Sequence, residues 1–421
     1  MSVFEKYKYG HHYRTILVAC YLFYTMTMAI KLAYTSQLVE IESFFKTSKA
    51  LASLGLTIYY FVYALAQVGL GLIISKIDIK KFLVITAILS AVSFSLIGVT
   101  NELWQVWIIL GLNGIFQCGG WGGVTYILGK NLPNDTLSHC SKVLVTGSVV
   151  GTAFSYLVSS ICIEFLSWKY TFVVIGVLYL ASTLFLLYQE NKIEKIHSRH
   201  DELDFDTFIK DHSHDYVIPK GEKVNLVPIM LFIVVLSFLA NCLYYGIGNW
   251  IPSYLKEVHL FPTSLSILIT LTMPLASVPS RIVMFKSFDK SGKIFPKSTL
   301  IGLILTIILI VMVFTYGLNL LFAILVSLAL KLLIEAFMAG FSSYTLMKFK
   351  NYINTGTSSL IVNSAASLGA GVIAIVSGLV MDAFGWSNYY LFLAILGIIS
   401  ISICGIGSII IKKKSNISTW L

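Results

Sequence analysis

Residues 298–316, STLIGLILTIILIVMVFTY, contain no charged side chain. A run of about 20 apolar residues in helical form crosses the hydrocarbon core of a bilayer, so this stretch predicts a transmembrane helix. Working outward from it, the residue types AVILMFWYC make up 57% of the 421-residue chain and charged residues only 12%. A soluble domain carries about 25% charged residues. The composition therefore excludes a soluble protein and predicts one that crosses the membrane many times.

Twelve apolar runs of this kind follow one another along the chain. Runs of this length without polar alternation satisfy their backbone hydrogen bonds in lipid as helices. One long polar stretch separates them into two groups of six. We therefore predict an all-α membrane protein with an N-terminal six-helix half (1–190), a hydrophilic linker (191–225) and a C-terminal six-helix half (226–421). The spans are expected near 14–37, 51–75, 82–100, 104–129, 142–165, 168–189, 226–254, 263–285, 298–316, 319–346, 356–382 and 387–411.

Basic side chains concentrate on one side of these spans. If the termini and the linker share a side, that side holds 24 of the 30 Lys and Arg residues, and the opposite side holds Lys46, Lys49, Lys169 and Lys256. Because basic residues are enriched in cytoplasmic loops, we expect both termini in the cytoplasm and the protein in the cell (inner) membrane. The net charge of +10 has the same explanation, so nucleic acid is not an expected partner.

The sequence offers no sign of a cofactor, a metal or a catalytic centre. The six cysteines are scattered without a CxxC pair, and four linker histidines lack the spacing of a structural zinc site. These are His197, His200, His212 and His214. There is no phosphate-binding glycine loop, no GxSxG and no HExxH motif, which argues against an enzyme or a primary pump. We expect a monomer.

The two halves resemble each other at a nearly constant offset. A shift of 218 residues places YILGK (126–130) on YTLMK (344–348), Gly151 on Gly369, and SWKYTF (167–172) on GWSNYY (385–390). Near the first and seventh spans, a shift of 217 pairs SQLVEI (36–41) with SYLKEV (253–258). Parallel repeats of this kind predict a substrate site between the halves, near the bilayer midplane.

This arrangement resembles the major facilitator superfamily, and two loops carry a related motif. SFDKSGKI (287–294) is similar to the cytoplasmic loop signature of that superfamily, and SKIDIKK (75–81) is a degenerate copy. The resemblance implies two pseudo-symmetric six-helix bundles that transport by alternating access. Acidic and basic groups at helix ends can pair and latch one conformation, so we predict gating roles for Asp78, Asp289 and Lys293. The alternative is an ordinary lysine-rich loop.

Within the superfamily, the chain resembles the organic-anion and organophosphate antiporters and related bacterial nutrient-uptake carriers. The segments that carry this are FQCGGWGGVTYILGKNLP (116–133), YYGIGNWIPSYLKEV (244–258) and GTSSLIVNSAASLGAGV (356–372). Sugar-phosphate antiporters hold phosphate with one arginine on the first helix and one on the seventh, where this chain has Met28 and Tyr244. Lys31 lies one turn from Met28. The resemblance thus implies a carboxylate-bearing solute, with phosphate exchange or a non-transporting sensor as alternatives.

Lys31, Lys331 and Glu335 are ionisable residues inside predicted spans. Such a group is costly at mid-membrane unless it is paired or hydrated, so it marks a functional site. Lys31 shares a helix face with Tyr24 and Met28, and we expect its ammonium group to attract a carboxylate in the cavity. The alternative is that Lys31 reaches the outer interface.

Lys331 and Glu335 stand four residues apart and can pair within one helix. The shift of 218 places them on Asn113 and Gln117, which predicts polar strips on both sides of one cavity. Glu335 is the predicted site of a coupling proton, with a structural ion pair as the alternative.

Further predicted substrate contacts are aromatic or amide side chains, each of which could instead serve packing: Trp121, Tyr244, Tyr245, Asn249, Trp250 and Asn363. The glycines of GGWGG (119–123), together with Gly147 and Gly151, are expected to permit close helix approach. Glu164 and Asp382, near outer helix ends, are expected to be solvated.

The sequence thus predicts a secondary active transporter for a small polar or anionic metabolite such as an amino acid, peptide or organic acid. Its expected partners are that solute, the lipid bilayer, and a coupling proton or counter-substrate.

Overall fold

The structure is a computed structural model that describes residues 10–73, 76–132, 134–197, 226–291, 294–340 and 355–414. The first half comprises α1 (Gly10–Ser36), α2 (Leu38–Phe45), α3 (Lys49–Ile73), α4 (Ile79–Leu96), η3 (Ile97–Val99), α5 (Leu103–Phe116), α6 (Gly120–Asn131), α7 (Asn134–Phe165) and α8 (Trp168–His197). The second half comprises α10 (Leu226–Asn249), α11 (Ile251–His259), α12 (Thr263–Thr270), α13 (Thr272–Ser291), α14 (Ile294–Thr315), α15 (Leu320–Ala339) and α17 (Thr355–Lys414).

Within these ranges, ten helical stretches are long and apolar enough to cross a membrane. The count is consistent with the twelve predicted spans, for two reasons. First, α17 turns back on itself at Gly385, whose φ of 75° is a conformation that glycine adopts readily, so α17 supplies two crossings. Second, α5 and α6 are separated by a short break after Phe116 and together make one crossing.

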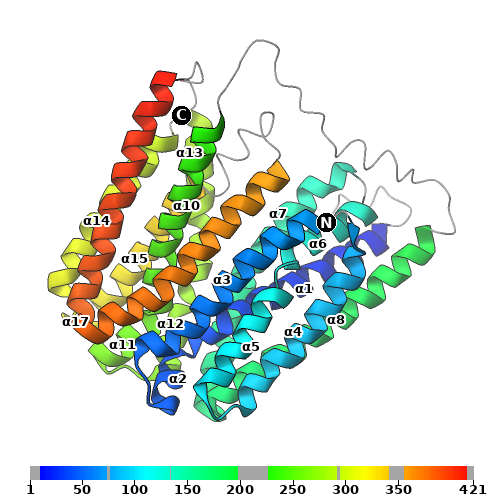
Figure 1. Ribbon diagram of the computed structural model, residues 1–421, viewed down its shortest axis with the longest axis horizontal. Helices are drawn as coiled ribbons and strands as arrows, with labels where there is room; N and C mark the ends of the chain where they lie inside the picture. The colour runs from blue at the N-terminus through cyan, green and yellow to red at the C-terminus, as the bar shows by residue number, and fades with distance from the viewer. Residues whose placement is uncertain are drawn as a thin grey trace.

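Figure 1 shows two groups of helices that meet near α2, α11 and α12 and spread apart toward the labelled termini. We call the end where α1 begins and α8 ends the linker end, and the end with α2 and α11 the distal end. α8 continues to His197, so the first residues of the predicted linker are helical. Burial of Ile193 in the first half accounts for this extension.

Paired breaks in the helices show the internal repeat. α1 gives way to α2 before Leu38, and α10 gives way to α11 before Ile251. α2 and α11 both end at a left-handed residue, Lys46 with φ 47° and Leu260 with φ 52°. These landmarks lie 213 or 214 positions apart, so the shift of 217 expected here is wrong. The error is about one helical turn, which keeps apolar faces in register and so escapes detection by sequence pattern.

The packing of two glycines supports the offset of 218 for the later helices of each half and the offset of 213 for the first helix of each half. A Cβ atom on Gly151 of α7 would lie 2.2 Å from the backbone oxygen of Thr25 on α1. A Cβ atom on Gly369 of α17 would lie 2.4 Å from the backbone oxygen of Phe238 on α10. The glycines are related by 218 positions and their partners by 213. The close helix approach expected at Gly151 is thus confirmed and repeated in the second half.

Candidate substrate site between the two halves

Lys331 is buried in the middle of α15, with 6% of its surface exposed. Its Nζ atom lies 3.1 Å from the centre of the Tyr244 ring on α10, a cation–π contact. Gly248 makes room for it, because a Cβ atom there would stand 3.2 Å from Nζ. Among the described residues, no carboxylate lies within ion-pair distance of this ammonium group.

Lys31 is partly buried on α1 and is also held by aromatic rings. Its Nζ atom lies 4.6 Å from the ring centre of Tyr63 and 5.3 Å from that of Tyr60, both on α3. The ion pairs between described residues do not include Lys31 either. Each half therefore contributes one lysine that contacts tyrosine rings.

A row of tyrosines connects the two lysines across the boundary between the halves. The ring of Tyr60 lies 5.2 Å from that of Tyr245, which lies 5.0 Å from that of Tyr244. By the structural shift of 213, Tyr244 is the counterpart of Lys31. Lys331 thus places its ammonium group over the position that is equivalent to Lys31.

A cavity of about 20 Å³ adjoins Lys331 and is lined by both halves. Thr152 and Tyr156 of α7 face it from the first half, and Tyr245 and Asn249 face it from the second. A cavity of this size admits about one water molecule, so the site is nearly closed. The Nδ2 atom of Asn249 is buried there without a hydrogen-bond partner. The cavity therefore offers an ammonium group and an amide donor on one side.

Glu335 does not pair with Lys331, although the two are four residues apart. Its Oε2 atom lies 2.6 Å from Nε and 2.6 Å from Nη2 of Arg281 on α13. The pair joins α13 to α15, with Glu335 only 1% exposed. Sequence reasoning alone groups Arg281 with the basic residues of the linker side and does not predict it as a site residue. Its place inside the predicted span 263–285 was the available signal.

Asn113 and Gln117 lie within the first half and form a network of their own. Ser90 Oγ donates to Asn113 Oδ1 over 2.7 Å, and Tyr59 Oη donates to Gln117 Oε1 over 2.7 Å. Gln117 Nε2 donates to Ser90 Oγ over 3.2 Å. These bonds join α3, α4 and α5. The amides of Asn113 and Gln117 hold helices together here and do not line the cavity beside Lys331.

Other predicted contacts lie elsewhere in the two halves. The rings of Tyr24 and Trp121 lie 5.0 Å apart within the first half, and Met28 packs against Gly151. Trp250 is buried in the second half, apart from Lys331 and among Tyr254, Trp386, Tyr389 and Tyr390.

Asn363 reaches across the two halves, where its Nδ2 atom donates to Gln67 Oε1 over 2.8 Å. Gln67 in turn donates to the hydroxyl of Tyr63, over 2.9 Å. Asn363 is thus linked through Gln67 to a tyrosine that holds Lys31.

Two of the three predicted gating residues lie at helix ends, Asp78 at the start of α4 and Asp289 near the end of α13. Asp78 caps α4 by accepting the backbone N–H of Lys81 over 3.1 Å. That bond stabilises the charged carboxylate and lowers the pKa of Asp78, so its contribution to stability is lost as pH falls through the lowered pKa. Asp289 lies in the last turn of α13. Lys293 lies outside the described residues.

Asp382 is exposed, as expected, and it also joins the two halves at the distal end. Its two carboxylate oxygens accept the backbone N–H groups of Lys49, over 3.1 Å, and of Ala50, over 2.9 Å. The Asp382 side chain, on α17, thereby caps the first turn of α3. The four free N–H groups at a helix start make this a favourable place for a carboxylate.

Other distal contacts also cross between the halves. Lys49 Nζ forms an ion pair of 2.9 Å with Glu257 of α11. Glu164, likewise expected to be solvated, accepts a hydrogen bond of 2.6 Å from Ser264 of α12. Glu164 is exposed, as expected, and makes this contact in addition. Helix starts and ends meet here, so polar groups can bond across the boundary.

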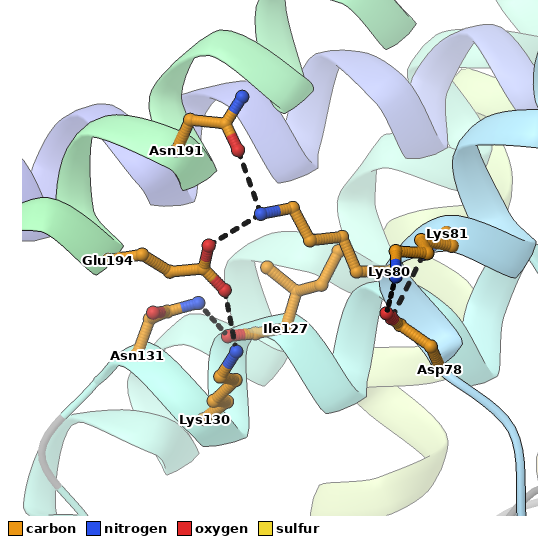
Figure 2. A network of polar contacts seen from close by, with 8 residues as sticks. All are labelled: Asp78, Lys80, Lys81, Ile127, Lys130, Asn131, Asn191 and Glu194. Carbon is orange, nitrogen blue, oxygen red and sulfur yellow. Dashed lines mark hydrogen bonds and ion pairs between the residues drawn. The ribbon is translucent and has the colours of Figure 1, made fainter.

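At the linker end, a charged network lies within the first half. Figure 2 shows Glu194 of α8 between Lys80 of α4 and Lys130 of α6, with oxygen–nitrogen distances of 2.6 and 2.7 Å. Asn191 adds a hydrogen bond of 2.8 Å to Lys80. The network fastens three helices of one half to each other.

The repeated helical bundle and the charged residues between its halves are typical of one family of proteins. A family model described as Major Facilitator Superfamily covers residues 16–362. The chain belongs to the major facilitator superfamily. This superfamily consists of transporters and not enzymes, as the sequence analysis predicted.

Sequence comparison also finds a curated relative, an uncharacterized transporter of Buchnera aphidicola subsp. Schizaphis graminum (strain Sg). It is 24% identical over 263 residues, which are 61% of this chain and 60% of that protein. The match thus spans less than two thirds of the relative.

Solved structures of the superfamily share the fold. A bacterial homolog of the human lysosomal transporter Spinster, inward-facing and occupied, superposes with a TM-score of 0.74 at 13% identity, over 97% of this chain and 99% of that one. The xylose transporter XylE from E. coli gives 0.71 at 12% identity, over 93% and 97%. The nucleoside transporter NupG gives 0.68 at 13%, over 94% and 98%. Likenesses at this identity establish the fold alone.

Proposed function

We propose that this major facilitator carries a small anionic solute, most simply one with a carboxylate, through the site between Lys31 and Lys331. The observation that supports it is the pair of lysines described above, one from each half. Both sit against tyrosine rings, and neither has a carboxylate partner among the described residues. An anionic solute would supply the missing counter-charge.

The charges around the site support this proposal. Arg281 and Glu335 neutralise each other, which leaves the positive charges of Lys31 and Lys331 uncompensated. A buried charge without a partner costs several kcal/mol, whereas a cation–π contact returns about 0.5 to 2 kcal/mol. Binding of an anion is therefore favoured at the place where both halves can grip it.

Transport would follow by rocking of the halves. We place the linker end in the cytoplasm, as the distribution of basic residues favours. The polar contacts of Asp382, Glu257 and Glu164 would then close the opposite side and break when the site opens outward. Exchange or a proton gradient would drive the transport. Glu335 is the candidate coupling residue, and Arg281 holds its carboxylate.

The test begins with a thermal-shift screen of amino acids, short peptides, organic acids and phosphate esters against purified protein, because ligand binding stabilises the folded state. The best ligand is then followed into liposomes. We expect Lys31→Gln and Lys331→Gln each to lower kcat/KM by about tenfold or more, since removing one buried charge contact typically costs at least about 2 kcal/mol. Lys192→Gln on the exposed side of α8 is the matched control.

Unchanged kcat/KM in both lysine variants would refute the proposed site. Transport of only neutral or cationic solutes would refute the proposed substrate class. Tight binding of a solute without any movement across the liposome membrane would favour a sensor that has kept the carrier fold.

A second candidate function is exchange of phosphate or phosphate esters. Tyr244 stands where the sugar-phosphate antiporters have an arginine, yet the structure places the ammonium group of Lys331 on its ring. Lys31 lies one turn from the other arginine position. Competition of inorganic phosphate against succinate in the same assay separates the two candidates. Stronger inhibition by phosphate would favour the second.

A further inference from the structure

Glu190 of α8 is a buried carboxyl group that the substrate site does not use. It is 0% exposed, although it lies near the linker end, one helical turn before Glu194. Neither Oε1 nor Oε2 has a hydrogen-bond partner. A buried side chain of this kind demands an explanation, because buried polar groups are nearly always hydrogen-bonded.

Three helices that pack on α8 bring titratable or charged groups near Glu190. These groups are Cys20 on α1, Asp78 and Lys80 at the start of α4, and Lys130 on α6, in addition to Glu194 on α8 itself. From α7, Cys140 interacts with Cys20. The remaining neighbour of α8, η3, lies at the other end of the helix. The two thiols are buried and not disulfide-bonded.

The two cations of this cluster are already engaged. Lys80 and Lys130 both bind Glu194, as Figure 2 shows. An ionised Glu190 would thus be a second negative charge beside Glu194, buried without a donor. Isolated buried carboxylates are so costly that such a group takes up a proton instead.

We propose that Glu190 is a proton-binding site at the linker end, and that Lys80 and Lys130 pair with Glu194 because Glu190 holds its proton. When Glu190 loses the proton, two carboxylates one turn apart on α8 compete for the same two lysines. Either lysine can then leave Glu194 for Glu190, which changes how α4 and α6 are fastened to α8. With the linker end in the cytoplasm, the site would respond to cytoplasmic pH.

Infrared spectroscopy of the full-length protein at about pH 7, in a detergent without ester groups, tests this directly, since a protonated carboxyl group then gives the carboxylic-acid carbonyl band without overlap from lipid esters. Glu190→Gln keeps the shape and neutrality of the protonated side chain. We expect it to lose one carboxyl group's share of that band relative to the unmodified protein. Glu164→Gln, which changes a carboxylate at the distal end, should leave the band unchanged.

Glu194→Gln tests the competition for the lysines. Once Glu194 is neutral, Lys80 and Lys130 are free to stabilise ionised Glu190, so the same band should disappear although Glu190 is intact. An undiminished band in Glu190→Gln would show that Glu190 is ionised and would overturn the proposal. A band that persists in Glu194→Gln would show that the lysines do not respond to Glu190 and would overturn it as well. Neither measurement depends on the transported solute.

Discussion

At the scale of single residues, the ionisable side chains inside the described helices are of two kinds: some are paired with an opposite charge, and others are not. Arg281 and Glu335 form a bonded pair, whereas Lys31 and Lys331 contact tyrosine rings and have no carboxylate partner among the residues that the structure describes. The pair is asymmetric, because the Glu335 side chain is 2% exposed and that of Arg281 is 39% exposed. The guanidinium group is thus the accessible member of the pair, and the carboxylate is the enclosed one.

This asymmetry predicts unequal costs for the two single substitutions. Arg281→Met leaves a buried carboxylate without a partner and should destabilise the protein by about 3 to 5 kcal/mol. Glu335→Gln leaves a partly exposed guanidinium and should cost clearly less. Thermal unfolding in detergent measures both. Equal losses, or a larger loss for Glu335→Gln, would mean that the pair is more accessible than the structure shows.

At the scale of helices, small residues set how closely neighbours approach. α7 crosses α1 at Gly151, and α17 crosses α10 at Gly369, in both cases against a backbone oxygen. In a membrane, close packing of this kind is a main source of helix association. The same contact occurs in both halves, so both depend on it in the same way.

Alanine at either glycine should therefore force the crossing helices apart. We expect Gly151→Ala and Gly369→Ala each to lower stability by about 1 to 3 kcal/mol, as overpacking does. Gly69→Ala on α3 is the matched control, because a Cβ atom there meets no atom within 4 Å. It should raise stability slightly, since alanine favours a helix by up to about 1 kcal/mol over glycine. Melting temperatures that do not separate the two groups would contradict this packing account.

At the scale of the whole molecule, the cap that Asp382 provides connects the halves. The residue lies on α17 and the N–H groups that it binds lie at the start of α3. Asp78 caps α4 in a similar way, but within one half. The two acids thus perform the same local task with different consequences for the relative position of the halves.

Asp382→Ala should shift the population toward conformations that are open at the distal end. Loss of a helix cap costs about 0.5 to 2 kcal/mol, enough to change a conformational equilibrium by about two- to thirtyfold. Spin labels at Ser43 and Leu260, both exposed near the distal end, report the change as a longer distance. Asp78→Ala should leave that distance unchanged. A distance that stays constant in Asp382→Ala would show that the cap does not hold the halves together.

The family match confirms the superfamily that the sequence indicated. The sequence by itself also determined the membrane class and predicted two six-helix halves. It also placed Lys31, Lys331 and Glu335 inside the membrane. These features follow from hydropathy and repetition along the chain, which are properties of consecutive residues. A repeat offset that was wrong by one turn did not disturb them, because a helix presents the same face again after one turn.

Only the tertiary structure decided which groups meet. Glu335 binds Arg281 rather than the lysine four residues away, Asn113 serves helix packing, and Asp382 bonds across the halves. The row of tyrosines between Lys31 and Lys331 likewise draws on helices far apart in sequence. The physical reason is that the cost of a charge in a membrane can be read from one segment, whereas the partner that offsets this cost comes from another helix, whose position is set by packing.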